Sequence, residues 1–129
     1  LMTVNALDDL PLPVYGDGSN KRNWLYVADH CSAVDMIIHH GKNGEIYNIG
    51  GGEDMSNIDT VKLILSILGK DSSLIRFTAD RKGHDRRYCI DSSKIRNELG
   101  WKPTVAFDDG LRRTVDWYKG NRKWWSSII

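Results

Sequence analysis

The stretch RNWLYVADH, residues 22–30, places an aromatic and β-branched run directly before residues that favour a helix. Residues 24–27 have the composition of a short strand. Asp29 is suited to cap the following helix, because its side chain can accept a hydrogen bond from a free N–H group of the first turn. The stretch therefore predicts a strand that leads at once into a helix. That helix is predicted to end at Gly41 and to bury Ala33, Val34, Ile37 and Ile38.

Further short extended segments and helices are predicted on both sides of this stretch. Ser56 and Asp59 fit a capping box for a second helix, and Gly69 follows its last turn. Asp91 is suited to cap a short helix that Gly100 ends. Mixed short strands and helices of this kind predict the α/β class. The remaining predicted elements are helices at residues 1–7 and from Asp108 onward, extended segments at 13–15, 45–49 and 74–78, and a turn at 16–19.

The composition is that of a globular protein with almost balanced charge. The 129 residues carry a formal net charge of +1, and 40% of them are hydrophobic. Proteins that coat nucleic acid have a strong basic excess, so any anion binding here is expected to be local, and no nucleic-acid partner is expected. No apolar run approaches the ~18 residues of a membrane span, and LMTVNALDD at the start lacks the basic beginning and long apolar middle of a signal peptide, so no membrane partner is expected. We expect Cys31 and Cys89 to be free thiols in a reducing, cytoplasmic compartment, while one disulfide between them stays possible.

The sequence lacks the motifs of a complete catalytic centre. The glycines at 50–52 do not have the spacing of a dinucleotide-binding fingerprint, and no Tyr is followed four positions later by Lys. His39 and His40 are adjacent, and adjacent helical residues do not face one ligand point, so a solvated pair is expected in place of a metal site. We therefore expect no catalytic, cofactor-binding or metal-binding residue in this chain.

The segment LPLPVYGDGSNKR, residues 10–22, offers polar backbone beside an aromatic ring. Pro11 and Pro13 hold their neighbours extended, which leaves backbone groups near Leu12 and Val14 outside any helix. Such groups, together with the ring of Tyr15, are what a planar heterocyclic base requires. An edge strand closed by a tyrosine explains the same residues. Arg22 follows, and its planar fork is suited to phosphate oxygens, although a lone arginine is more often a surface residue.

The segment DRKGHDRRY, residues 80–88, concentrates cationic side chains around one glycine. Gly83 allows the loop to fold tightly. Arg22 and Arg81 together would place two guanidinium groups on the two phosphates of a diphosphate, a pairing that is strong only in a partly dehydrated cleft. A solvated turn with internal Asp–Arg pairs is the alternative interpretation.

Four stretches resemble one family in the same order and at similar spacing. These stretches are PLPVYGDGSNKRNWLYVADH, GEIYNIGGGEDMSNID, DRKGHDRRYCID and ELGWKP. They resemble the C-terminal part of the dTDP-glucose 4,6-dehydratases, which are extended short-chain dehydrogenase/reductases. The resemblance implies that residues 1–129 are the C-terminal substrate-binding lobe of a Rossmann-type enzyme whose N-terminal NAD-binding domain is missing from this chain.

The resemblance also implies an activity that these residues alone do not indicate. The family uses NAD to convert dTDP-glucose into dTDP-4-dehydro-6-deoxy-glucose and water, on the route to dTDP-rhamnose. NAD would be bound by the missing N-terminal domain, the full-length enzyme would be a cytoplasmic homodimer, and the fragment alone would be inactive. By the same resemblance, the residues that bind dTDP-glucose would be Leu12, Pro13, Val14 and Tyr15 along the base and Arg22, Asn57, Arg81, Gly83, His84 and Tyr88 around the ribose and diphosphate.

Two alternatives stay open from the sequence. One is the corresponding lobe of a UDP-sugar 4-epimerase or decarboxylase of the same superfamily. The other, from a different class, is a stand-alone nucleic-acid or protein interaction module built on the basic loop.

Overall fold

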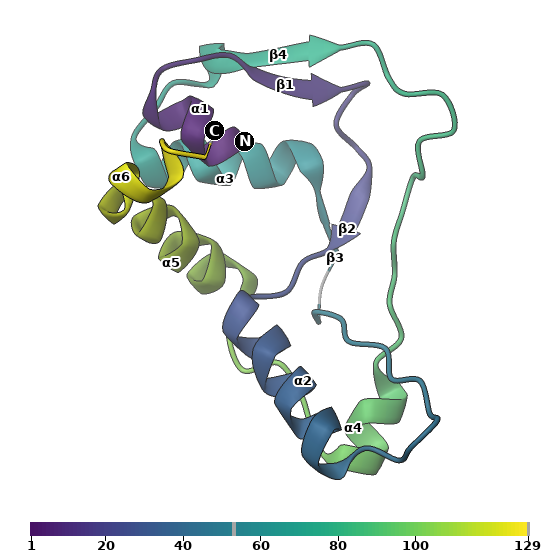
Figure 1. Cartoon of the computed structure of the whole chain (residues 1–129). Helices are drawn as coiled ribbons and strands as arrows, with labels where there is room; N and C mark the ends of the chain where they lie inside the picture. The colour runs from purple at the N-terminus through teal and green to yellow at the C-terminus, as the bar shows by residue number, and fades with distance from the viewer. Residues whose placement is uncertain (53, 129) are drawn as a thin grey trace.

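The computed structural model describes residues 1–52 and 54–128 (Figure 1). Helices and short strands alternate along the chain, which confirms the predicted mixed α/β class. None of the helices in these two ranges combines the length and the apolar character that crossing a bilayer requires. The elements are α1 Met2–Leu7, β1 Leu12–Tyr15, β2 Lys21–Asn23, α2 Val27–His40, β3 Asp54–Ser56, α3 Asn57–Leu68, the 3₁₀ turn Ser72–Leu74, β4 Ile75–Thr78, α4 Ser93–Leu99, α5 Phe107–Gly120 and α6 Arg122–Trp125.

The strands form two small sheets. β1 and β4 pair in parallel, with Leu12 opposite Ile75 and Tyr15 opposite Thr78. β2 and β3 pair antiparallel, with Arg22 opposite Met55. The β1–β4 pair joins segments about sixty residues apart, and the β2–β3 pair leads directly into α3.

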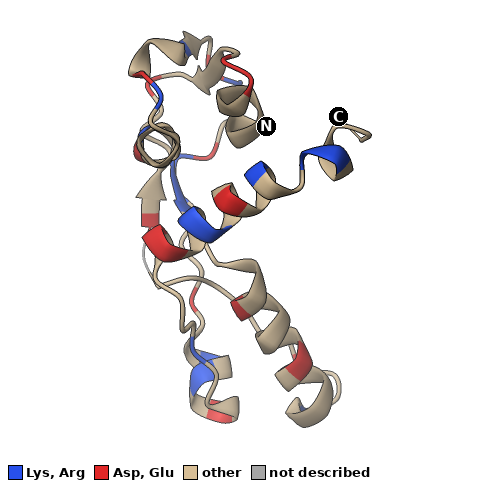
Figure 2. Ribbon diagram, turned by 90° about the vertical axis from the view of Figure 1, so that its left-hand side faces the viewer, with Lys and Arg blue, Asp and Glu red and all other residues tan. Residues whose placement is uncertain are grey.

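Two hydrophobic cores divide the molecule into two arms (Figures 1 and 2). The larger core lies among α1, β1, α3 and α5, and the smaller one joins α2 and α4 to Trp101. Figure 2 shows blue and red segments mixed over both arms, and they alternate along α5. The buried members of the larger core are Ala6, Leu12, Val14, Val61, Ile64, Leu65 and Val115.

The helix ends of α3 and α4 lie at or within one residue of the predicted caps. Ser56 is the N-cap of α3 and accepts a hydrogen bond from the Asp59 N–H at 3.1 Å, as a capping box requires. Gly69 ends α3 in the left-handed conformation with φ of 64°. Asp91 stands one residue before the N-cap of α4, and its carboxylate accepts from the Ser93 N–H at 2.8 Å. The predicted helix positions are confirmed, with α4 beginning one residue later than a cap at Asp91 implies.

The strand predicted at residues 24–27 is wrong. β2 ends at Asn23, and α2 begins at Val27 with Tyr26 as its N-cap. The carbonyl oxygen of Trp24 packs so tightly on Gly51 that an added Cβ there would lie 1.8 Å away. This segment therefore faces another piece of backbone without a ladder of hydrogen bonds.

The predicted cap at Asp29 is also wrong. Asp29 stands inside the first turn of α2, since the helix begins two residues earlier. The predicted buried stripe is correct for Ala33, which is fully buried, but Val34 and Ile38 are exposed. Val34 is 38% exposed and Ile38 is 73% exposed, so the described residues cover this side of α2 only in part.

The extended run at residues 45–49 forms no strand among the described residues. The Tyr47 hydroxyl donates to Glu98 at 3.1 Å, and Lys94 donates to the Ile46 carbonyl at 2.9 Å. The run is therefore held against α4, and no strand among the described residues lies beside it as a pairing partner.

Candidate functional site

Arg22 on β2 contacts a loop that lies some sixty residues further along the chain. Its Nη2 lies 3.0 Å from His84 Nε2, and its Nη1 donates to the Asp85 carbonyl at 3.1 Å. Both partners belong to the segment that runs from β4 to α4 in Figure 1. The predicted convergence of Arg22 with this loop is therefore present in the fold.

Backbone hydrogen bonds hold the loop beside β2. The Lys21 N–H donates to the Arg86 carbonyl at 2.9 Å, and the Tyr88 N–H donates to the Lys21 carbonyl at 3.2 Å. Lys21 and Arg87 form an isolated parallel bridge. The loop thus acts as a short extra strand along β2, and this pairing fixes where its side chains lie.

Arg81 lies on the same side as Arg22, and aromatic rings connect the two. The Arg81 guanidinium lies 5.1 Å from the centroid of the Tyr15 ring, which meets the His84 ring edge-on at 6.2 Å. The Arg22 guanidinium lies 4.3 Å from the centroid of the Tyr88 ring. Five of the predicted site residues therefore form one continuous cluster.

Leu12, Pro13 and Val14 are placed differently from Tyr15. The side chains of Leu12 and Val14 are buried in the larger core, and Pro13 is half-buried. The Tyr15 side chain faces outward and is 46% exposed. Leu12 and Val14 are buried as whole residues, at 0% and 2% exposed, and β1 is paired with β4, so the exposed group at this end of β1 is the Tyr15 side chain.

Asn57 lies at the first turn of α3, next to the start of β2. Its N–H donates to the Asn20 carbonyl at 2.9 Å. The preceding residue, Ser56, pairs with Lys21, so Asn57 stands close to the strand that carries Arg22. The N-terminus of a helix of this length is also a favourable place for a negative charge.

Gly83 has the conformation that the sequence predicted. Its φ of 69° lies in the left-handed region, and the His84 N–H closes the turn onto the Arg81 carbonyl at 3.2 Å. An added Cβ would meet no atom within 4 Å. The glycine therefore serves the backbone conformation of the loop and leaves open space above it.

Carboxylates hold two side chains of the loop, Tyr88 and Arg87, in place. The Asp85 carboxylate accepts from the Tyr88 hydroxyl at 2.6 Å, and this bond raises the pKa of Tyr88 above its ordinary value of 10.0. Arg87 pairs with Asp54 at 2.6 Å. Asp54 belongs to β3, so this pair is not one of the internal Asp–Arg pairs of the alternative interpretation, and Arg22 and Arg81 contact carbonyls and rings.

Asp80 is a site residue that the sequence reasoning missed. Its Oδ1 lies 2.6 Å from His84 Nδ1, and the hydrogen bond with His84 lowers the pKa of Asp80 below 3.8. The four-residue spacing of Asp80 and His84 was visible in the sequence. The spacing alone did not predict a contact, because Asp80 and His84 meet only through the turn that Gly83 allows.

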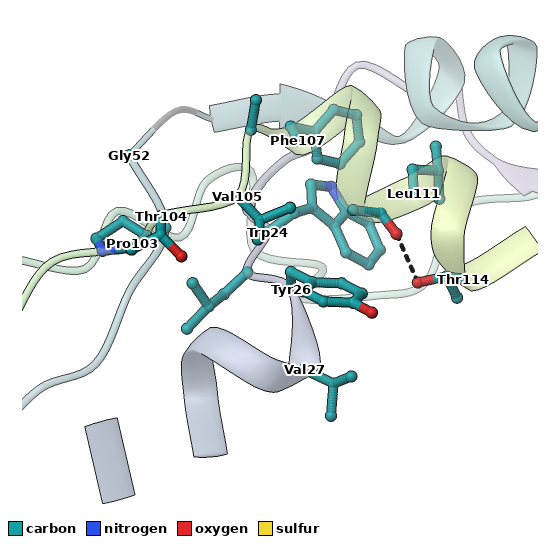
Figure 3. A pocket seen from close by; sticks show the side chains of 14 residues that line it. Trp24, Tyr26, Val27, Gly52, Pro103, Thr104, Val105, Phe107, Leu111 and Thr114 are labelled. Atoms are coloured by element: carbon teal, nitrogen blue, oxygen red, sulfur yellow. Dashed lines mark hydrogen bonds between the residues drawn. The ribbon is translucent and has the colours of Figure 1, made fainter. Parts of the chain in front are cut away.

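A separate hollow of about 580 Å³ lies between the start of α2 and the start of α5 (Figure 3). The rings of Trp24 and Phe107 lie in it with centroids 6.5 Å apart. The Thr114 hydroxyl donates to the Gly110 carbonyl at 2.8 Å, the dashed line of Figure 3. The size suits a ligand, but no charged side chain lines this hollow. It is therefore unsuited to a diphosphate, and it is distinct from the Arg22 cluster.

Neither a metal site nor a dinucleotide cradle emerges from the described residues. In residues 1–52 and 54–128, no group of three His, Cys, Asp or Glu side chains could hold a metal ion. Gly50 packs on Asn23 and Ile90, and Gly51 packs on Trp24. These glycines thus allow close packing within the chain and do not open toward a ligand. Cys31 and Cys89 are both exposed free thiols, as predicted.

Comparison with known proteins gives consistent matches. A family model described as GDP-mannose 4,6 dehydratase matches residues 2–114. A curated dTDP-glucose 4,6-dehydratase from Streptomyces niveus is 47% identical over 128 residues, which are 99% of this chain and 38% of that protein. The chain therefore spans well under half the length of the curated relatives it matches.

Solved structures agree with the sequence matches. A dTDP-glucose 4,6-dehydratase from Streptomyces venezuelae was solved with NAD and dTDP bound. Its structure matches this chain with a TM-score of 0.94 and 48% identity, and the match covers 99% of this chain and 40% of that one. A UDP-glucose 4-epimerase from Thermotoga maritima, solved with UDP-glucose, has a TM-score of 0.87 at 30% identity, over 94% of this chain and 38% of that one. The predicted resemblance to the dTDP-glucose 4,6-dehydratases is confirmed.

Proposed function

We propose a function for this chain from one premise: it belongs to the GDP-mannose 4,6-dehydratase family. Residues 1–129 are the dTDP-sugar-binding portion of a dTDP-glucose 4,6-dehydratase. The whole enzyme converts dTDP-glucose into dTDP-4-dehydro-6-deoxy-glucose and water. The observation that supports this most is the cluster that joins Arg22 to the loop of Arg81 and His84.

The cluster supplies what a nucleoside diphosphate needs. Guanidinium groups donate in a planar fork to phosphate oxygens, and Arg22 and Arg81 approach from two different elements. Tyr15 has an exposed ring for the base, next to the backbone of β1. In this proposal Asn57, Gly83 and Tyr88 complete the wall around the ribose and the phosphates.

The cofactor belongs to another domain in this proposal. The described glycines do not fit a dinucleotide, because those at 50 and 51 are packed against the chain itself. NAD would supply the oxidation and the return of hydride when bound by an N-terminal Rossmann domain. The apolar hollow around Trp24 and Phe107 supports a further domain that covers this face. Hydrogen exchange tests this, since the backbone at 24–27 should be better protected in the full-length enzyme than in the isolated chain, and equal protection would refute it.

The setting of the enzyme is part of the same proposal. The full-length protein acts as a homodimer in the cytoplasm, on the route to dTDP-rhamnose. Two exposed free thiols suit a reducing compartment.

Titration calorimetry with dTDP tests the proposed function in the full-length enzyme. Arg22→Ala and Arg81→Ala should each weaken dTDP binding about tenfold or more, because each removes a charged donor from a phosphate. Arg112→Ala, an exposed arginine on α5, is the matched control and should bind dTDP like the unchanged protein. Unaltered affinity in both site variants would refute the site.

The match to the UDP-glucose 4-epimerase keeps a second candidate, a UDP-sugar enzyme of the same fold. UDP titrated under the same conditions separates the two. Tighter binding of dTDP supports the dehydratase, and a clear preference for UDP supports the epimerase. A nucleic-acid module is disfavoured, because acidic and basic residues are interspersed along the helices and loops of both arms (Figure 2).

A further inference from the structure

His84 is a buried side chain in an otherwise exposed loop. Only 5% of its side-chain surface is accessible, although the loop residues around it are mostly exposed. Both ring nitrogens have partners: Nδ1 lies 2.6 Å from Asp80 Oδ1, and Nε2 lies 3.0 Å from Arg22 Nη2. The ring therefore connects a carboxylate on one side to a guanidinium on the other.

The two partners determine which ring nitrogen carries the proton. A guanidinium has only donors, so Nε2 can pair with Arg22 only as an acceptor. The single proton of the neutral ring must then lie on Nδ1, where it is donated to Asp80. The carboxylate can accept it, because the pKa of Asp80 is held below 3.8. In this arrangement Nδ1 donates to Asp80, and Nε2 accepts from Arg22.

Asp80 is itself held in place by its surroundings. Its Oδ1 also accepts from the Arg81 N–H at 2.9 Å. Gly16, which follows β1 with φ of 58°, lies so close that an added Cβ would come within 3.0 Å of Asp80 Oδ2. Two hydrogen bonds and the close approach of Gly16 therefore orient the carboxylate, although 46% of the Asp80 side chain is exposed.

We propose that Asp80 is a positioning residue that fixes the His84 tautomer, and that diphosphate binding takes up one proton at His84 Nε2. This inference rests on the proposed function. When a diphosphate arrives, Arg22 turns from His84 to a phosphate oxygen, and Nε2 loses its donor. A proton from solvent binds Nε2, which then donates to the phosphate while Nδ1 still donates to Asp80.

The charges around His84 favour the protonated ring only when ligand is present. The groups that face it are Asp80 on its own loop, Arg22 on β2, the Tyr15 ring with Arg81 beyond it, and Asp85, whose carboxylate is engaged by Tyr88. Without ligand, a second ring proton would point at the Arg22 guanidinium, and like charges repel. With ligand, the imidazolium lies between two anions, Asp80 and the phosphate.

Titration calorimetry of the full-length enzyme with dTDP, in two buffers of different ionisation enthalpy, measures this proton. The unchanged enzyme should take up protons on binding near pH 8, and the uptake should disappear in His84→Gln, which keeps a donor but cannot be protonated. Asp80→Asn should bind dTDP roughly tenfold more weakly and show little uptake. Asp116→Asn, an exposed carboxylate on α5, should match the unchanged enzyme in both.

Nitrogen NMR of the ligand-free enzyme shows which ring nitrogen of His84 carries the proton. It therefore tests whether Asp80 sets the His84 tautomer or only stabilises the loop. The unchanged enzyme should show the proton on Nδ1. Arg22→Ala should also show it there, because the Asp80 carboxylate can only accept, whereas the double variant Arg22→Ala/Asp80→Asn should show a mixture of tautomers, because an amide can donate or accept. Normal dTDP binding with no proton uptake, or an unaltered tautomer in the double variant Arg22→Ala/Asp80→Asn, would overturn the inference and leave the proposed function intact. Failure to bind dTDP would overturn both.

Discussion

Single carboxylates fix much of the local geometry, and Asp29 is the clearest case. Its Oδ1 accepts from the Thr104 hydroxyl at 2.7 Å, and its Oδ2 accepts from the N–H groups of Thr104 and Val105 at 3.1 and 3.0 Å. Asp29 is 4% exposed. The sequence predicted correctly that the Asp29 carboxylate accepts hydrogen bonds from backbone N–H groups. It predicted wrongly that these N–H groups belong to the first turn of α2. The true partners are 75 residues away, and no local pattern identifies them.

Replacing Asp29 by Asn should destabilise the chain by about 2 kcal/mol, because a neutral amide accepts these bonds more weakly than a carboxylate and has one acceptor oxygen where the carboxylate has two. Urea unfolding measures this, with Asp35→Asn on the exposed side of α2 as the control. If Asp29→Asn lowers the unfolding free energy no more than Asp35→Asn does, the hydrogen bonds of Asp29 contribute little to stability.

The Asp29 carboxylate also predicts how stability responds to acid. Burial raises its pKa, but the hydrogen bonds from Thr104 and Val105 outweigh burial, and the pKa lies below 3.8. A lowered folded-state pKa means that the carboxylate stabilises the fold above about pH 4 and loses that contribution as the pH falls further. The unfolding free energy of Asp29→Asn should therefore fall less steeply below pH 4 than that of the unchanged chain.

At the scale of elements, the sequence predicted what is local and missed what needs a distant partner. The helix ends at Ser56, Gly69 and Gly100 follow from capping chemistry that lies within a few residues. The strands expected at 24–27 and 45–49 depend on a neighbour that composition does not specify. In both places the chain packs on another segment without a strand ladder. β1 and β4 were predicted because each is bounded by its own turn chemistry.

The contact between Gly51 and the segment before α2 gives a test with an internal control. An added Cβ at Gly51 would lie 1.8 Å from the Trp24 carbonyl oxygen, so the backbone must move. Gly51→Ala should cost about 3 kcal/mol in unfolding free energy. Gly52→Ala should be nearly neutral, because an added Cβ there meets nothing within 4 Å. Equal effects of the two substitutions would contradict this packing.

At the scale of the whole molecule, two arms meet at β2 and β3, and the Arg22 cluster forms where the loop from β4 crosses β2. The sequence indicated which residue types gather there, through the motif of residues 80–88. It did not indicate Asp80 as the partner of His84 or the apolar hollow, since both depend on how distant segments fold together. The chain matches about two fifths of its relatives, so the site it presents is one wall of a larger enzyme in our account.

The central claim is that Arg22 and Arg81 bind the same diphosphate, and a double-mutant cycle tests it most directly. The affinity for dTDP is measured by calorimetry in the full-length enzyme, in Arg22→Ala, in Arg81→Ala and in the double variant. We predict that both single variants lose affinity and that the double loss differs from their sum by at least about 0.5 kcal/mol, because groups that share one ligand are coupled. If the losses of binding free energy in the two single variants add up to the loss in the double variant, the two arginines do not bind one diphosphate together. Wild-type affinity for dTDP in all variants would contradict the account.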